Sequence, residues 1–463
     1  MKKILALSMA ALCTASLLTS CATKKGTTQA MVEENPGLEV SESVAETFTK
    51  TIDATPIAVV NKVSDSGNVH MSISAKESGQ KVNVDFWVST GKSINAAARI
   101  DAMGINGTAY LNENALVLEC DKILGNKAYG IGFKNLADKL EDSVLPELMG
   151  IAADELLGEA GDAIEMIENF GDYVKESAEY LAESENDLYE IISDEGNYTA
   201  KEEKFSVSDG EVMAVVLDYE IIPELVSTVA KEYLEIMLDS PAVTNYLSTF
   251  GAYGELGANM FTSGMLDEYL DETIDQIEYD VYDAFEEMGV DEIPLTIVIN
   301  KATGAFVYAE LENNEGEKIT IDLGVNPEKS DKWILSIEDD GEEFEVVLTK
   351  KFAKNNVEIA LEADGDELFA IEIKGGKLTI EADGEEVLTG DCKYSKNSFE
   401  LTIEEVGGEP MQPSMTIAVD TKAAPKAPGY KDILTMSMQE FEKLGQTVQT
   451  NMMRSMGGMD MMY

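Results

Sequence analysis

The chain has 463 residues and a formal net charge of −54, from 88 acidic and 34 basic residues. A surface this acidic repels phosphate backbones, so nucleic acid is excluded as an expected partner. Hydrophobic residues make up 44% of the chain, enough for a core. The length suggests about three domains, or a single β-rich domain with a large insert.

Residues 1–20 predict a secretory signal peptide. Lys2 and Lys3 precede an apolar run that ends near Leu18 and is too short to span a bilayer. The segment Leu18-Thr19-Ser20-Cys21 has the form of a bacterial lipoprotein cleavage site. We expect lipidation of Cys21, which would hold the mature chain on a membrane outside the cytoplasm. An ordinary cleaved signal with an incidental cysteine is the alternative.

Arginine is nearly absent, with only Arg99 and Arg454 in the chain. This composition and the acidic charge favour a low-GC Gram-positive source. Cys21 would then anchor the chain in the outer leaflet of the plasma membrane. A periplasmic address at an inner or outer membrane is the alternative.

The segment that follows the signal changes character twice. Residues 22–37 are polar, rich in small side chains and end in Asn35-Pro36-Gly37, which predicts a lipidated flexible tether over 21–39. Apolar residues then recur four apart over 40–52, the spacing of a helix. From about 67 to 134 apolar and polar residues alternate, which predicts antiparallel strands joined by short turns.

The chain after residue 135 repeats this change. The period is mostly helical over 136–289, with a strand pair near 204–207 and 211–219. Strands resume over 293–420, where aliphatic residues alternate with Glu, Thr and Asp. Helices must cover the aliphatic face. We therefore expect an α+β domain over 40–422 with a large helical insertion, then a linker, a short helix and a methionine-rich tail over 423–463.

Residues for catalysis are sparse. His70 is the only histidine and falls on the polar positions of a predicted strand, so we expect a solvated side chain. The segments Gly91-Lys92-Ser93 and Ser89-Thr90-Gly91-Lys92 match parts of phosphate-binding and serine acyltransferase motifs, but the rest of each motif is missing. We expect no catalytic residues and no enzyme.

Ligands for metals and cofactors are equally sparse. Cys120 and Cys392 have no neighbouring histidine or cysteine for zinc, and they form either a disulfide or two buried thiols. Acidic segments at 339–343 and 364–367 lack the spacing of a calcium loop. Four methionines of the tail have spacings that suit copper(I), although a frayed helix end is favoured: Met453, Met456, Met459 and Met461. We expect no metal and no cofactor.

Two segments carry a resemblance to known proteins. In residues 127–145, a strand with Tyr129-Gly130-Ile131 leads directly into a helix at Asn135, and residues 430–437 read Tyr-Lys-Asp-Ile-Leu-Thr-Met-Ser. With the order of the elements, they resemble bacterial lipoproteins built as an incomplete β-barrel around helices. These include the localisation carriers LolA and LolB, the mycobacterial LppX and LprG, and lipoproteins of low-GC Gram-positive bacteria. The chain is longer than the small carriers and has a larger helical insert.

The resemblance implies a strongly curved antiparallel sheet, an incomplete barrel, with an apolar pocket between sheet and helices. The expected function is non-enzymatic binding of a lipid or another apolar ligand by a membrane-anchored, extracytoplasmic lipoprotein. The alternative is a cell-surface interaction or scaffold lipoprotein with a fully packed core and no small-molecule ligand. The sequence does not indicate which protein partner it would bind.

Overall fold

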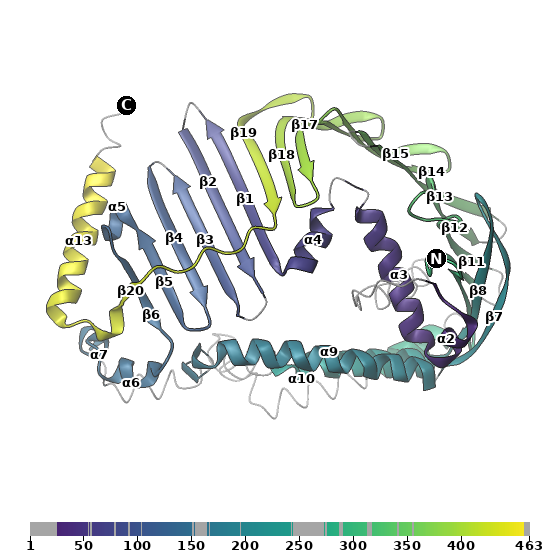
Figure 1. Cartoon of the computed structure of the whole chain (residues 1–463), viewed down its shortest axis with the longest axis horizontal. Helices are drawn as coiled ribbons and strands as arrows, with labels where there is room; N and C mark the ends of the chain where they lie inside the picture. The colour runs from purple at the N-terminus through teal and green to yellow at the C-terminus, as the bar shows by residue number, and fades with distance from the viewer. Residues whose placement is uncertain are drawn as a thin grey trace. The chain divides into compact units, whose positions relative to one another are not determined.

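The computed structural model of the chain divides into two compact units, which are described separately (Figure 1). Unit 1 comprises Met1–Ile57, Ala178–Ser240 and Ser263–Thr389, and unit 2 comprises Ala58–Ser177, Pro241–Thr262 and Gly390–Tyr463. The structure describes residues 26–457 except 54, 56–57, 78–79, 91–92, 103, 151, 153–163, 166, 195, 242, 244–272, 274–275, 287–289, 313–316, 340–341 and 354–355. The predicted signal peptide and Cys21 lie outside the described residues.

The sheet of unit 2 contains the first run of predicted strands as an antiparallel meander from β1 to β6. The free edge of β1 pairs with β19, and β19 pairs with β18. The other end of the sheet is β20, which pairs in parallel with β6. The spatial order is β18 (Ser398–Val406), β19 (Glu409–Asp420), β1 (Asn68–Glu77), β2 (Gln80–Ser89), β3 (Asn95–Ala102), β4 (Ile105–Asn112), β5 (Ala115–Cys120), β6 (Ala128–Gly132) and β20 (Tyr430–Asp432).

One face of this sheet is covered by an extended segment, residues 421–429, which we call the strap. In Figure 1 it is the yellow trace that crosses β1 to β5 between β19 and β20. Ala427 of the strap packs against a buried cluster on β3 to β6, and the Ala424 N–H donates a 2.8 Å hydrogen bond to Ser89 Oγ. The strap therefore shields the polar face of the meander from water.

Short helices flank the sheet of unit 2, and α4 packs against β1 and β19. The C-terminal helix α13 begins at Met438 because Ser437 and Glu440 form a capping box. The Ser437 N–H donates to Glu440 Oε2 at 3.1 Å, and the Glu440 N–H donates to Ser437 Oγ at 3.4 Å. The described helices are α4 (Val59–Ser66), α5 (Asp121–Leu124), α6 (Leu136–Glu141), α7 (Leu145–Met149), the 3₁₀ turn η1 (Ile433–Thr435) and α13 (Met438–Gly457).

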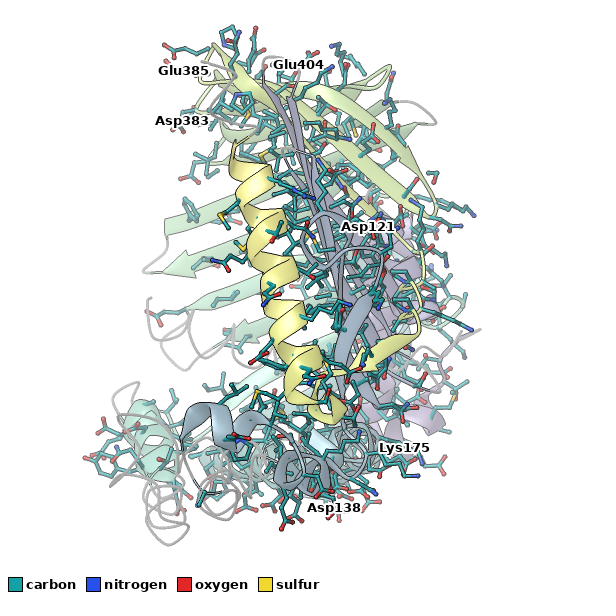
Figure 2. The ribbon with its side chains drawn as sticks, turned by 90° about the vertical axis from the view of Figure 1, so that its left-hand side faces the viewer. Asp121, Asp138, Lys175, Asp383, Glu385 and Glu404 are labelled. Atoms are coloured by element: carbon teal, nitrogen blue, oxygen red, sulfur yellow. The ribbon has the colours of Figure 1, made fainter. Side chains whose placement is uncertain are left out.

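Unit 1 holds the second run of strands, paired in chain order and antiparallel throughout. Asp383 and Glu385, at the turn after β16, point into solvent (Figure 2). The strands are β7 (Asn197–Val207), β8 (Gly210–Ile221), β9 (Ile293–Asn300), β10 (Phe306–Glu312), β11 (Lys318–Asp322), β12 (Lys332–Asp339), β13 (Glu342–Ala353), β14 (Asn356–Ala363), β15 (Asp366–Lys374) and β16 (Lys377–Ala382). The next strand, β17 (Glu385–Ser395), has residues in both units.

Helices cover the aliphatic face of the unit 1 sheet. Val44 of α3 (Pro36–Asp53) is buried against Phe306 and Leu323. Leu225 of α10 (Pro223–Asp239) is buried against Tyr219 of β8, with α9 (Phe170–Asp194) packed beside it. These contacts form the core of the unit.

The described part of the predicted tether, residues 26–39, is not a free tether. Thr28 caps α2 (Gln29–Glu34), whose Val32 is fully buried against Val215 and Ile299. The helix predicted from residue 40 begins earlier, as α3 at Pro36, since Asn35 Oδ1 accepts the Leu38 N–H and proline fits the first helical position. The polar composition of this segment gave no indication that Val32 would be buried.

The predicted α+β class with a curved antiparallel sheet is confirmed. Among the described strands of each unit, the two end strands do not pair with each other, so neither sheet is closed. The predicted strand pair inside the helical insert is present as β7 and β8; β7 begins earlier than expected, at Asn197, and β8 continues to Ile221.

Candidate functional site

The aliphatic face of the unit 2 meander is the main candidate site. Because side chains alternate between faces, the cross-strand row Met71–Phe86–Ala98–Ala109–Leu118 lies on one face. The rows on either side of it are equally apolar. From Val69 to Ala75 of β1 and throughout β2 to β5, no residue on this face is charged; Glu77 follows at the end of β1.

Large apolar side chains on this face are exposed. Ile100 is 56% exposed and Leu118 is 49% exposed. We call the exposed set the apolar patch: Met71, Val82, Phe86, Val88, Ile100, Leu116 and Leu118. Single exposed apolar residues are normal, but this set gathers on one face of the sheet, on β1, β2, β3 and β5, and a gathered set is typical of a binding surface.

The opposite face carries a buried polar cluster around His70. The predicted solvated histidine is wrong, because His70 is 8% exposed. Its ring stacks on Trp87, directly across on β2, with 4.7 Å between the ring centroids. Its Nε2 lies 3.3 Å from Asp85 Oδ1, and its Nδ1 lies 3.1 Å from Asp420 Oδ1 without good hydrogen-bond alignment.

The two carboxylates of this cluster are stabilised in their charged forms. Burial raises the pKa of Asp85, but hydrogen bonds from Ser72, Asn83 and His70 outweigh it and hold that pKa below its usual value. Burial raises the pKa of Asp420 likewise, and the hydrogen bonds from Lys422, together with the His70 ring beside it, lower it overall. Both ring nitrogens of His70 face carboxylates, so neither is placed to accept a proton from a substrate. The cluster ties β1 to β2 and β19.

A buried lysine is the unusual group of unit 1. Lys350 is 3% exposed and lies on the aliphatic positions of β13. Its Nζ donates to the Pro327 carbonyl and lies 4.8 Å from the Trp333 ring centroid and 5.7 Å from that of Phe352. Burial lowers the pKa of Lys350, although Asp331 and Glu328 partly offset it. No carboxylate forms an ion pair with Lys350 in the described part of the chain.

The two segments that carried the sequence resemblance contact each other. Tyr430 of β20 packs over Gly130 and Gly132 of β6, where an added Cβ would meet Tyr430 atoms at 2.9 and 2.8 Å. Asp432 pairs with Lys139 of α6 at 2.9 Å and accepts the Gly132 N–H. We call residues 430–437 the C-terminal clasp, since its Leu434 is also buried against Leu136.

The other residues singled out by sequence do not come together in a site within the described part of the chain. Cys120 and Cys392 are free thiols, and burial raises the pKa of Cys392 to about 11. Ser89 lies in β2 and binds the strap, while Gly91 and Lys92 lie outside the described residues. Of the tail methionines, Met453 is 61% exposed on α13 and the last two are outside the described residues. In the described part of the chain, no group of three metal-binding side chains occurs.

Comparisons with known proteins add little to this geometry. No family model and no curated protein matches the chain. A crystal structure of MucB in complex with MucA(peri) is weakly similar, at 9% identity and a TM-score of 0.10 over 82% of this chain and 93% of that chain. A similarity of this size carries no conclusion about function. Among the described helices, none has the length and apolarity needed to cross a membrane.

Proposed function

We propose that the protein is a membrane-anchored, extracytoplasmic lipoprotein that binds a lipid or another apolar ligand on the apolar patch, without catalysing a reaction. The observation that supports this proposal is the exposure of seven large apolar side chains on one face of the sheet, from β1, β2, β3 and β5. Burying a hydrocarbon chain there would yield about 0.8 kcal/mol per methylene group.

The charge of the chain favours a ligand without a negative headgroup. The net charge of −54 repels anionic amphiphiles as they approach, while the patch offers no cation to pair with them. A neutral acylglycerol meets both conditions. We therefore expect neutral lipids to bind more tightly than fatty acid anions of the same chain length.

Charge substitutions on the patch test the proposal. Phe86→Glu and Leu118→Glu should each weaken binding of a fluorescent monoacylglycerol at least tenfold, because a carboxylate would then face the hydrocarbon chain. Both positions are more than two-fifths exposed, so the melting temperature should change little. Leu368→Glu in unit 1, at a position 42% exposed, is the matched control and should bind normally.

The scaffold alternative makes the opposite prediction. A wild-type protein that binds no monoacylglycerol, or variants that bind as well as the wild type, would exclude lipid binding at this patch. The apolar patch would then be assigned to contact with a protein.

The membrane anchor rests on Cys21 and has its own test. Cells grown with a labelled fatty acid should incorporate the label into the wild-type protein and place it in the membrane fraction. The Cys21→Ser variant should lose both the label and the membrane association. A labelled Cys21→Ser variant would contradict lipidation at this residue.

A further inference from the structure

Unit 2 contains an open pocket of about 600 Å³ on its polar face, away from the apolar patch. It lies where the end of β5 and the loop before β6 meet the end of the strap. The size falls within the range of small-ligand sites. Its lining residues are Glu119, Asp121, Asn126, Lys127, Ala128, Pro428, Gly429, Tyr430 and Lys431.

The pocket follows from one row of side chains across three strands. Glu119 of β5 and Tyr430 of β20 are both in register with Ala128 of β6, which lies between them. The small Ala128 side chain leaves space between a carboxylate and an aromatic ring. The glycines of β6 hold the Tyr430 ring close to the sheet, so the wall on this side is fixed.

The charged side chains around the pocket differ in whether they already have a hydrogen-bond or ion-pair partner. Glu119 Oε2 accepts a 3.0 Å hydrogen bond from the Tyr110 hydroxyl, and Asp121 (labelled in Figure 2) adds a second carboxylate. Lys431 is paired with Glu440, and hydrogen bonds from Lys431 and Ser437 lower the pKa of Glu440 to about 2. Lys127 forms no ion pair with the residues that the structure describes.

We propose that this pocket binds a small zwitterion that carries an ammonium group and one anionic group. An ammonium group is stabilised by negative charge and by the face of an aromatic ring. Here the two carboxylates provide the negative charge and Tyr430 provides the ring. Lys127 provides the cation for the anionic group. The ligand could be a free solute or the headgroup of a zwitterionic lipid, because both present this chemistry.

Three probes of matched shape separate the charges. Glycine betaine is the zwitterion, 3,3-dimethylbutyrate replaces its ammonium by a neutral carbon, and choline lacks the carboxylate. Titration of the full chain carrying Cys21→Ser, followed by saturation-transfer NMR, should show saturable binding of betaine. We expect the other two probes to bind at least tenfold more weakly.

Variants assign the binding to this pocket. Glu119→Gln should weaken betaine binding at least tenfold, and it keeps an acceptor for Tyr110, so the fold should be retained. Lys127→Met should weaken betaine but leave choline unchanged. Glu113→Gln, on the exposed turn between β4 and β5, is the control and should bind as the wild type. Competition by phosphatidylcholine vesicles would identify a lipid headgroup as the source, and its absence a free solute.

Several results would overturn the proposal. These are no saturable binding of betaine, equal binding of 3,3-dimethylbutyrate or choline, or betaine binding that Glu119→Gln leaves unchanged. None of them bears on the apolar patch, which lies on the other face of the sheet.

Discussion

At the scale of single residues, His70 is buried because neighbouring strands bring a partner to each side of its ring. Its charged neighbours are Asp85 on β2 and Asp420 on β19, with Lys422 of the strap beside Asp420. Arg99 of β3 lies 6.0 Å from the centroid of the Trp87 ring on which His70 stacks. The cluster is therefore a charge network inside the sheet.

Removal of His70 should destabilise the protein in a pH-dependent way. His70→Ala removes the ring that contacts both Asp85 and Asp420, which should lower the free energy of unfolding by about 3 kcal/mol at pH 7. The folded-state pKa values of Asp85 and Asp420 are depressed, so their stabilisation is present above about pH 4 and is lost as the pH falls through those values. Urea unfolding at pH 7 and pH 3 should therefore show a smaller difference at pH 3; an equal difference would contradict this account.

Removal of Lys350, unlike removal of His70, should not destabilise the protein at neutral pH. Its pKa is depressed by burial, so the folded state disfavours the charged amine at neutral pH. The stability of the wild type should then rise relative to Lys350→Met as the pH increases towards about 10.5, the value for an unfolded chain. At pH 7 we expect Lys350→Met to be as stable as the wild type or more stable. A thermal melt in which the variant is much less stable at pH 7 would show that the cation–aromatic contacts outweigh the cost of burial.

At the scale of the elements, the alternation of apolar and polar residues predicted most strands, but it could not predict which residues meet across them. The pairing of His70 with Trp87 depends on the register of β1 and β2, in which Glu77 lies opposite Gln80. Lys350 was visible as a break in the run Phe344, Val346, Leu348, Lys350, Phe352, and that signal was missed. The burial of Val32 was not predictable from the polar sequence around it.

The strap also changes the environment of residues far from it in sequence. The sequence predicted only a linker after residue 422, because proline and alanine break the strand pattern. In the structure this linker shields the polar face, and β20 extends the sheet at β6. Contacts between segments about 300 residues apart have no local sequence signal, so the candidate pocket could not be predicted.

The C-terminal clasp gives a direct test of this arrangement. A Cβ added at Gly130 would lie 2.6 Å from the Leu116 carbonyl oxygen and 2.9 Å from Tyr430 Cδ2. Gly130→Ala should therefore loosen β20 and cost about 2 kcal/mol of stability. Hydrogen exchange should show faster exchange over 430–437. Gly429→Ala, which meets nothing within 4 Å, is the control and should exchange as the wild type does; equal protection in Gly130→Ala would contradict the packing.

At the scale of the whole molecule, the two units differ in how they cover their sheets. In unit 1 helices pack on the aliphatic strand positions and form a conventional core. In unit 2 the strap covers the polar face, while large apolar side chains stay exposed on the other face. Leaving several large side chains in water costs folding free energy, at about 25 cal/mol per Å². We infer that a bound apolar ligand offsets this cost by covering these side chains.

Native mass spectrometry of the full chain carrying Cys21→Ser, purified from a lipid-rich bacterial host, tests this central claim most directly. The account predicts a bound mass of a few hundred daltons that organic solvent releases as a neutral lipid, present also in Leu368→Glu and absent from Phe86→Glu. A protein that carries no such mass, and takes up none when monoacylglycerol is added, would contradict lipid binding and favour the scaffold alternative.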